Sequence, residues 1–239
     1  MLTLRYGCAT DVGRLRSENQ DSLYAGDGLF LVADGMGGQP AGDLASKLAI
    51  AELSTLSRPI TPPALEAGIR QANDRLLAEG RQDPRRYGMG TTLSGLAVLD
   101  RGGWAVINVG DSRVYRFADG RLEQLTVDHS AVQALVDAGL LDQRAALRHP
   151  RRNVVTRSLG TEPPPLPDIQ LRDPVAGERF LICSDGLTNE LSDAEIGRLL
   201  AAAEQPQQAA DQLVEQAVLA GGRDNVTVIV VELIEQAES

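Results

Sequence analysis

The stretch that decides the fold is Leu31-Val32-Ala33-Asp34-Gly35-Met36-Gly37-Gly38, in which an apolar run ends at an acid surrounded by glycines. Two further acids stand in similar settings, Asp185 after the apolar run 181–183 and Asp224 before the apolar run 226–231. Each acid lies where a buried strand is expected to meet a turn, and such positions present side chains to functional sites. Because neighbouring carboxylates repel one another, the pattern indicates one or two hard divalent cations held by oxygen ligands.

The bulk composition is that of one soluble globular domain. The 239 residues are 43% hydrophobic and 23% charged, and we find neither an internal repeat nor a linker, so residues 1–239 are expected to form a single domain. The net charge of −10 disfavours nucleic acid and anionic membranes as partners. No apolar segment approaches the ~20 residues that span a bilayer, and the polar end 235–239 predicts no membrane tether. Cys8 and Cys183 stand in strand-like contexts, which favours reduced thiols in a cytoplasmic protein.

One alternative site lies near the amino terminus. Cys8 and Arg14 have the C-x5-R spacing of cysteine-dependent phosphatases, whose loop wraps a phosphate with backbone N–H groups. Asp11 would place a negative charge inside that loop, and no helix start follows it. A buried strand cysteine is the favoured interpretation.

Apolar periodicity predicts an α/β (α+β) four-layer αββα sandwich, with two central, mostly antiparallel sheets flanked by helix pairs. Hairpins are expected at Arg101-Gly102-Gly103 and at Asp119-Gly120. Strands are expected over 4–10, 29–33, 93–99, 104–109, 113–117, 122–125, 178–184 and 225–233. Helical stripes are expected over 41–51, 65–76, 196–203 and 210–217.

The segment from about 128 to 167 differs in character, because it holds both histidines, several arginines and the Pro163-Pro164-Pro165 run. One short helix is expected over 132–139, and the whole segment is interpreted as a mobile flap or binding loop beside the site. Its arginines are equally compatible with contacting a phosphoprotein and with solvating a loop: Arg148, Arg151, Arg152 and Arg157.

Short motifs that combine acids, glycines and hydroxyl or amide side chains follow one another along nearly the whole chain. They are Thr10-Asp11-x-Gly13-x-x-Arg16-x-x-Asn19-Gln20-Asp21, Asp34-Gly35-Met36-Gly37-Gly38, Gly90-Thr91-Thr92, Asn108-Val109-Gly110-Asp111-Ser112-Arg113, Leu125-Thr126-x-Asp128-His129-Ser130, Thr156-Arg157-x-Leu159-Gly160, Ser184-Asp185-Gly186-Leu187 and Asp224-Asn225-Val226-Thr227. Each motif alone is weak. In this order, from about Thr10 to Val231, they closely resemble the bacterial metal-dependent serine/threonine protein phosphatases of the type 2C (PPM) family.

The resemblance implies a centre with two Mn²⁺ or Mg²⁺ ions that activates a bridging water. Asp34 matches the acid that bridges the two ions, and the backbone carbonyl of Gly35 matches a ligand of one of them. Asp185 and Asp224 match the ligands of the other ion. Asp111, together with Asp185, matches the site of a third, weaker ion.

The resemblance also implies roles around these ligands. Arg16 matches the arginine that binds the substrate phosphate, and Arg14 next to it serves as a comparison. Residues beside the metal ligands are expected to be Gln20, Asp21 and Asn225. Met36 departs from relatives that carry a histidine there, so a metal-bound water is the favoured proton donor to the leaving group. His129 is the less favoured donor, and Ser130 is a second flap candidate.

The expected function is therefore hydrolysis of phosphoserine or phosphothreonine in proteins, reversing the action of a bacterial Ser/Thr kinase. Two alternatives stay open: a catalytically silent phosphoprotein-binding relative, and a metallohydrolase for small phosphate esters or nucleotides. The intact acids argue against the first. Aromatic residues make up only 3% of the chain and no phosphate-binding GxxxxGK loop is present, which argues against the second. A monomer is the default expectation.

Overall fold

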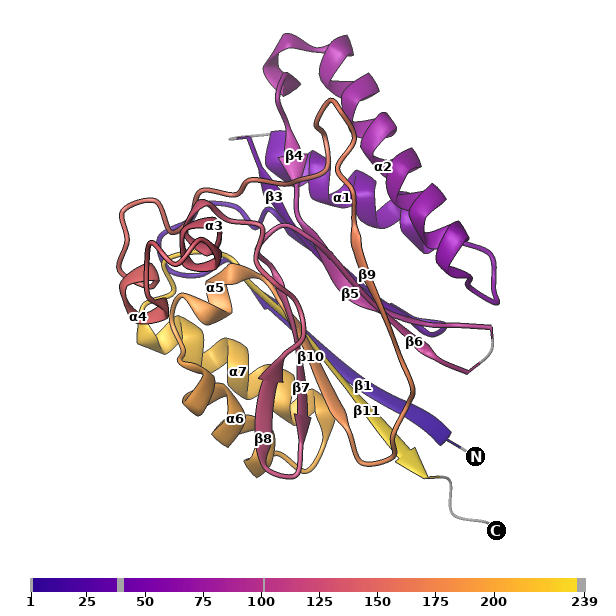
Figure 1. Cartoon of the computed structure of the whole chain (residues 1–239), viewed down its shortest axis with the longest axis vertical. Helices are drawn as coiled ribbons and strands as arrows, with labels where there is room; N and C mark the ends of the chain where they lie inside the picture. Colours follow the sequence, from indigo (N-terminus) through magenta and orange to yellow (C-terminus); the bar gives the residue numbers. More distant parts are fainter. Residues whose placement is uncertain (1, 38–40, 101, 236–239) are drawn as a thin grey trace.

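A computed structural model describes residues 2–37, 41–100 and 102–235 as two β-sheets packed face to face between helices (Figure 1). One sheet has the strand order β1-β11-β10-β7-β8, and the other has the order β2-β3-β5-β6-β9, with β4 paired to β3. All paired strands of the two sheets are antiparallel. In sheet order, the first sheet contains β1 (Leu2–Asp11), β11 (Val226–Glu235), β10 (Arg179–Cys183), β7 (Arg113–Ala118) and β8 (Arg121–Gln124). The second contains β2 (Asp21–Gly26), β3 (Leu29–Met36), β5 (Leu93–Val98), β6 (Trp104–Val109) and β9 (Asp168–Arg172), with β4 (Gly90–Thr91) at its end.

Helices cover the outer face of each sheet, which confirms the four-layer sandwich. The second sheet carries α1 (Ala41–Ser54) and α2 (Pro62–Gln82), followed by the short 3₁₀ turn Pro84–Arg86. The first sheet carries α6 (Asp193–Ala202) and α7 (Pro206–Ala220), with the short α5 (Asp185–Thr188) at its end. None of the helices in the described ranges is both long and apolar enough to cross a lipid bilayer.

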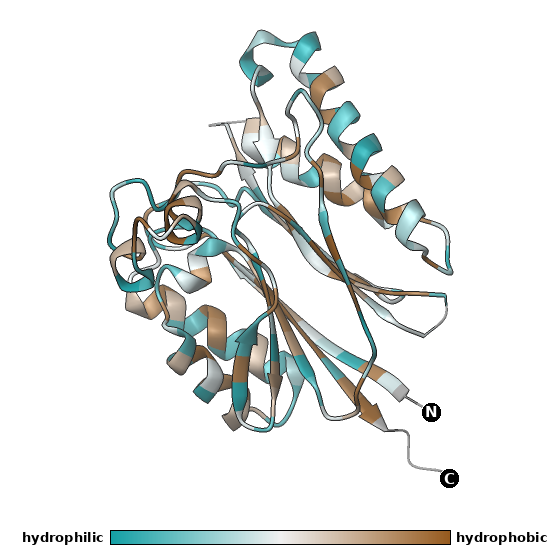
Figure 2. Cartoon of the chain, in the orientation of Figure 1, coloured by the Kyte–Doolittle hydropathy of each residue, from teal (hydrophilic) through white to brown (hydrophobic). Residues whose placement is uncertain are grey.

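Strand β3 shows why the apolar run before Asp34 is uninterrupted. Leu29, Leu31 and Ala33 pack against the helices α1 and α2, whereas Phe30 and Val32 belong to the core between the two sheets. Alternate residues of a strand point to opposite faces, so a strand buried on both faces needs apolar residues throughout. Figure 2 shows the same division across the molecule, with hydrophobic strands inside and hydrophilic residues recurring along the outer helices.

Local turn and cap chemistry agrees with the sequence-based expectations. The Asp119-Gly120 hairpin has φ values of 52° and 71°, as a two-residue turn with positive φ at both positions requires. The β5–β6 pair closes at Val98 opposite Trp104, which confirms the hairpin around Gly102. Ser192 and Glu195, whose S-x-x-E spacing is the sequence pattern of a capping box, form that capping box at the start of α6. Gly38 and Arg101, named in the sequence motifs, lie outside the described residues.

Some elements were not expected from the sequence. Strands β2, β4 and β9 escaped prediction because β4 is very short and β2 and β9 are the half-exposed edges of their sheet. The flap contains α3 (Ala131–Asp137), close to the expected helix, and a second short helix, α4 (Gln143–Ala146).

The stem of the flap is held firmly to the rest of the molecule. A bridge joins Ser130 to Val155, another joins Thr91 to Leu159, and the Thr156 N–H donates to the His129 carbonyl at 2.8 Å. His129, at the start of the flap, is buried and hydrogen-bonded on both sides, so it belongs to this stem.

Candidate functional site

The acids singled out in the sequence meet at one end of the two sheets. Asp34 lies near the end of β3, Asp185 opens α5 directly after β10, Asp224 lies two residues before β11, and Asp111 follows β6. Burial raises the pKa of Asp34 well above its usual range, and the neighbouring charges of Asp21, Asp185, Asp111 and Asp224 raise it further. Strands from both sheets therefore bring carboxylates close enough for their charges to raise one another's pKa.

The electrostatics of this acid cluster favour a cation. Burial raises the pKa of Asp21 and of Asp111 to about 7, and the charge of Asp185 adds to both shifts. Burial and Asp224 raise the pKa of Asp185, while hydrogen bonds from Asn189 and Asp34 offset part of that rise. Carboxylates in such a cluster either bind protons or share a cation, and their oxygen atoms are the ligands that hard divalent ions prefer.

Asp224 raises the pKa of Asp185 through its charge and also makes an ion pair with Arg16. The Arg16 Nη2 donates to Asp224 Oδ2 at 2.6 Å, and this hydrogen bond is the largest cause of the raised pKa of Arg16. Within the described part of the chain, no three His, Cys, Asp or Glu side chains form a ready-made metal-binding group. A cation at Asp224 would have to share or displace the Arg16 contact.

Asp21 supports the cluster from the partner strand of β3, directly opposite Asp34 in the register. Its Oδ2 accepts a hydrogen bond of 2.8 Å from Ser184 Oγ, and Ser184 Oγ in turn accepts from the Thr227 N–H at 3.0 Å. Its Oδ1 is buried and has no hydrogen-bond partner among the described residues. An orphaned carboxylate oxygen beside other acids fits a cation or its water, since buried polar atoms are otherwise paired.

Gly35 and Asp34 are held by the backbone around them. A Cβ at Gly35 would lie 2.1 Å from the Gly42 carbonyl oxygen, so no side chain fits there and the backbone stays close to the acids. Thr91 Oγ1 and the Thr92 N–H both donate to the Asp34 carbonyl at 2.9 Å, and Thr92 Oγ1 accepts from the Asp34 N–H at 2.9 Å. The Gly90-Thr91-Thr92 motif thereby fixes the position of Asp34.

Asn225 ties the Arg16 loop to the Asp224 turn. Its Oδ1 accepts from the Gln20 N–H at 2.8 Å, and its Nδ2 donates to the carbonyls of Val12 and Glu18 at 2.9 Å each. The amide is therefore occupied by backbone groups and holds the loop 12–20 against the turn at Asp224. Gln20 likewise supplies its backbone, since its carbonyl accepts from the Gly35 N–H at 3.2 Å.

The two neighbouring arginines, Arg14 and Arg16, differ in what they contact. Both side chains are exposed, but only Arg16 contacts the acid cluster. The backbone N–H of Arg14 donates to the Gly222 carbonyl at 2.6 Å, which closes the loop against the turn before Asp224. Arg16 is therefore the arginine that lies beside the acids, whereas Arg14 holds the loop through its backbone.

His129 and Ser130, the two flap candidates, hold structure in place. The Gly110 N–H donates to His129 Nδ1 at 3.0 Å, and His129 Nε2 lies 3.1 Å from Asp168 Oδ2. Burial lowers the pKa of His129, and the charge of Arg157 lowers it further. Because Nδ1 accepts from the Gly110 N–H, the neutral ring carries its proton on Nε2, which faces Asp168 Oδ2 and also lies 3.0 Å from Arg157 Nη1. Neither nitrogen is free to deliver a proton to a ligand. Ser130 Oγ caps α3 by accepting from the Gln133 N–H at 3.2 Å.

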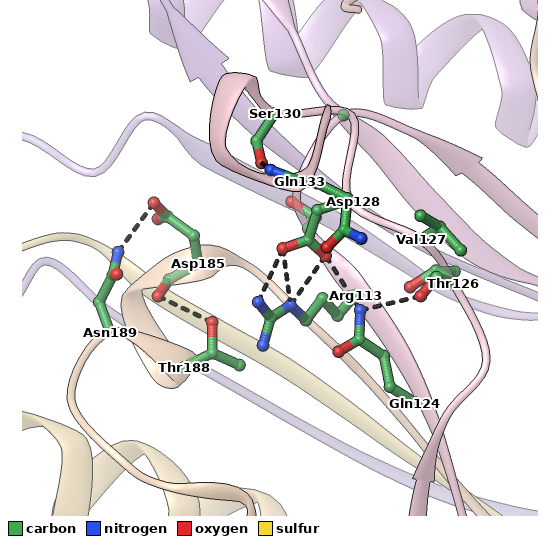
Figure 3. Close-up of polar contacts among 12 residues, drawn as sticks. Arg113, Gln124, Thr126, Val127, Asp128, Ser130, Gln133, Asp185, Thr188 and Asn189 are labelled. Atoms are coloured by element: carbon green, nitrogen blue, oxygen red, sulfur yellow. Dashed lines mark hydrogen bonds and ion pairs between the residues drawn. The ribbon is translucent and has the colours of Figure 1, made fainter. Parts of the chain in front are cut away.

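A groove of about 1030 Å³ runs from Asp111 and Asp185 along the flap. Figure 3 shows its inner part, where Arg113 makes a two-pronged ion pair with Asp128, at 2.9 and 2.7 Å, and Asn189 donates to Asp185 at 2.9 Å. Arg113 and Asp128 lie in two of the sequence motifs, but neither their ion pair nor the contact of Asn189 with Asp185 was predicted from the sequence.

The alternative cysteine site is not supported. Cys8 lies within β1 opposite Ile229, and its backbone N–H donates to Gln207 Oε1 at 3.1 Å. Residues 2–11 form a continuous strand, so no loop wraps around this thiol.

Comparison with known proteins identifies the class of this fold and site. A profile of the Protein phosphatase 2C family matches residues 14–217, and the chain belongs to this family of metal-dependent phosphatases. The serine/threonine protein phosphatase PstP of Mycobacterium tuberculosis (strain ATCC 25618 / H37Rv) is 40% identical over 98% of the chain. The chain spans about half of that relative, 46% of its length.

Solved structures agree with this assignment. The crystal structure of the M. tuberculosis phosphatase PstP/Ppp superimposes with a TM-score of 0.91 at 40% identity, covering 97% of this chain and 99% of that one. The catalytic domain of PstP, solved in complex with two manganese ions, superimposes with a TM-score of 0.88 at 38% identity, covering 98% and 100%. The expected α/β sandwich of this family is thus confirmed.

Proposed function

We propose that this chain hydrolyses phosphoserine and phosphothreonine in proteins, in opposition to a bacterial Ser/Thr kinase. The observation that carries the proposal is the convergence of Asp34, Asp111, Asp185 and Asp224 from both sheets, with Arg16 at their edge. Membership of the family and the manganese-bound relative support a centre with two divalent ions.

In this proposal Asp34, the Gly35 carbonyl, Asp185 and Asp224 hold two Mn²⁺ or Mg²⁺ ions. Asp111 holds a third, weaker ion together with Asp185. When bound, such ions activate a water for in-line attack and neutralise charge on the phosphoryl group. The orphaned Asp21 Oδ1, the close approach of backbone at Gly35 and the all-oxygen donor set fit these ions.

The remaining steps belong to the side chains of the chain itself. Arg16 exchanges its contact with Asp224 for the substrate phosphate, whose oxygens match a guanidinium fork. Met36 has no proton to donate, and both nitrogens of His129 are engaged. The leaving alkoxide therefore takes its proton from water in the cleft rather than from either residue.

Turnover of a phosphothreonine peptide tests the proposal. We expect Mn²⁺-dependent release of phosphate, abolished by EDTA and by Asp34→Asn, with no comparable turnover of nucleotides. Peptide binding without phosphate release in Mn²⁺ would instead indicate a silent phosphoprotein-binding relative, and a preference for nucleotides would indicate a small-ester hydrolase.

The setting of this activity is also part of the proposal. Cys8 and Cys183 are both free thiols, which supports a cytoplasmic location, since that compartment keeps thiols reduced. We infer that the chain works there as a monomer.

A further inference from the structure

The groove beside the acid cluster has two walls of different origin. The flap forms one wall through α3, α4 and the segment that follows α4, and the segment from Thr188 to Ala194 forms the other. Asp111 and Asp185 lie at its inner end. Its volume of about 1030 Å³ lies at the upper end of the range for ligand sites, so several residues of a polypeptide fit beside the reacting phosphate.

The charges deep in the groove are paired within the chain. Arg113 binds Asp128, with the two residues mostly buried, and Arg223 binds Glu190 at 2.9 Å from the opposite wall. These arginines have their counter-ions and are not available for a ligand carboxylate.

Two other arginines on the flap wall have no such counter-ion among the residues that the structure describes. Arg148 and Arg152 both line the groove, and no hydrogen bond or ion pair joins either side chain to another described residue. They belong to the segment 143–161, which contains five arginines and no Asp or Glu in a chain whose net charge is −10. Unpaired positive charge is therefore concentrated on this side of the cleft.

The same wall offers apolar contact. Leu147 is 67% exposed and Val127 is 49% exposed, and both line the groove together with the buried Val132. Exposed aliphatic side chains beside cations suit a polypeptide, which presents carboxylates and aliphatic side chains together.

We propose that this groove binds an acidic segment of the substrate protein next to the phosphorylated residue, with Arg148 and Arg152 as the residues that recognise its carboxylates. The inference rests on the proposed function and deepens it, because it specifies which phosphoproteins are preferred. Complementary charge across such a surface acts mainly on selectivity and on the rate of association, and salt weakens it.

Two phosphothreonine peptides test the inference, one flanked by Asp and Glu and the other by Asn and Gln at the same positions. We expect the wild type to show a kcat/KM ratio in favour of the acidic peptide of about five- to tenfold at low salt, the size expected of two partly exposed charge pairs. Arg148→Gln with Arg152→Gln brings that ratio close to one, chiefly through KM for the acidic peptide.

Arg144 and Arg151 provide matched controls. Both are exposed arginines of the same segment, and neither lines the groove. Arg144→Gln with Arg151→Gln changes the net charge equally and is expected to keep the preference. If both double variants lose the preference for the acidic peptide equally, the preference comes from the overall charge of the flap and not from the groove, and the assignment is overturned.

The failure of this inference is distinguishable from failure of the proposed function. A wild type that turns over both peptides equally refutes the groove as an acidic-segment site and leaves the phosphatase function standing. A folded protein with Mn²⁺ that releases phosphate from neither peptide refutes both. Melting curves of each variant show whether a change reflects loss of the fold.

Discussion

Replacing Asn225 with alanine tests how the phosphate-binding loop is attached to the acid cluster. The side chain is buried, and it makes three hydrogen bonds to backbone groups of residues more than 200 positions away in the sequence. No neighbouring polar side chain is described as sharing these bonds, so Asn225→Ala leaves one N–H and two carbonyls without their partners.

The magnitude follows from those contacts. A net contribution of about 1 kcal/mol for each hydrogen bond gives a loss of roughly 3 kcal/mol in the free energy of unfolding. Asn225→Asp is expected to be at least as harmful, because a carboxylate oxygen would face the carbonyls of Val12 and Glu18, which now accept from Nδ2. Loosening this loop also frees Arg16, so KM for a phosphate ester rises more than kcat falls.

Urea unfolding with and without Mn²⁺ measures the first effect, and steady-state kinetics with para-nitrophenyl phosphate measure the second. Asn19→Ala is the matched control, since this neighbouring amide is partly exposed and bonds Thr10 Oγ1 and the Asp21 N–H. We expect a clearly smaller loss for Asn19→Ala. A loss below about 1 kcal/mol for Asn225→Ala, with KM unchanged, would refute the role assigned to this side chain.

Three further outcomes are expected. Arg16→Ala should change the free energy of unfolding by less than about 1 kcal/mol, because its ion pair is half-exposed. It should nevertheless raise KM for phosphate esters at least tenfold, whereas Arg14→Ala should leave both quantities nearly unchanged. Equal effects of the two substitutions on KM would contradict the assignment. In the metal-free protein, the raised pKa of Asp21 means that the folded state binds more protons than the unfolded state between pH 3.8 and about 7. The free energy of unfolding should therefore fall as pH rises through this window, by up to about 1.4 kcal/mol per pH unit for each such group, and Mn²⁺ should raise Tm more at pH 7.5 than at pH 5.5. An equal rise at both pH values counts against this coupling. Gly186→Ala places a methyl group 1.9 Å from a backbone carbonyl oxygen of the turn before β11, so it should lower the free energy of unfolding by about 2–3 kcal/mol. Gly197→Ala is the control, because the nearest neighbour of its methyl group would lie 3.7 Å away, and it should lower the free energy of unfolding little or not at all. Thermal or urea unfolding measures both changes.

Local patterns predicted much of this molecule. The uninterrupted run 29–33 indicated a buried strand, and the structure adds that its alternate residues lie in two separate cores. The Asp119-Gly120 pair and the Ser192–Glu195 capping box carry their turn and cap chemistry within a few residues, so they need no knowledge of the rest of the chain. The same holds for the position of each acid at the end of a strand, which follows from the apolar run next to it.

Some site residues were marked by a local sequence pattern and others were not. Asp34, Asp185 and Asp224 stood out because each lies at or near the end of an apolar run, and Arg16 stood out only through the resemblance to a family. The supporting contacts had no local mark, since an asparagine such as Asn225 looks like any turn residue in the sequence. The flap candidate His129 likewise proved to be a buried link between Gly110 and Asp168.

The sequence by itself thus determined most of the helices and strands, the helical faces that are buried and the identity of the acids, because hydrophobic period and turn chemistry act over short distances. Only the tertiary structure decided which strands lie side by side, such as β1 with β11 at opposite ends of the chain, and which side chains share a hydrogen bond. Those choices depend on how two whole sheets pack and register against each other. That packing brings Val12, Glu18 and Gln20 to the amide of Asn225, and no short-range pattern encodes it.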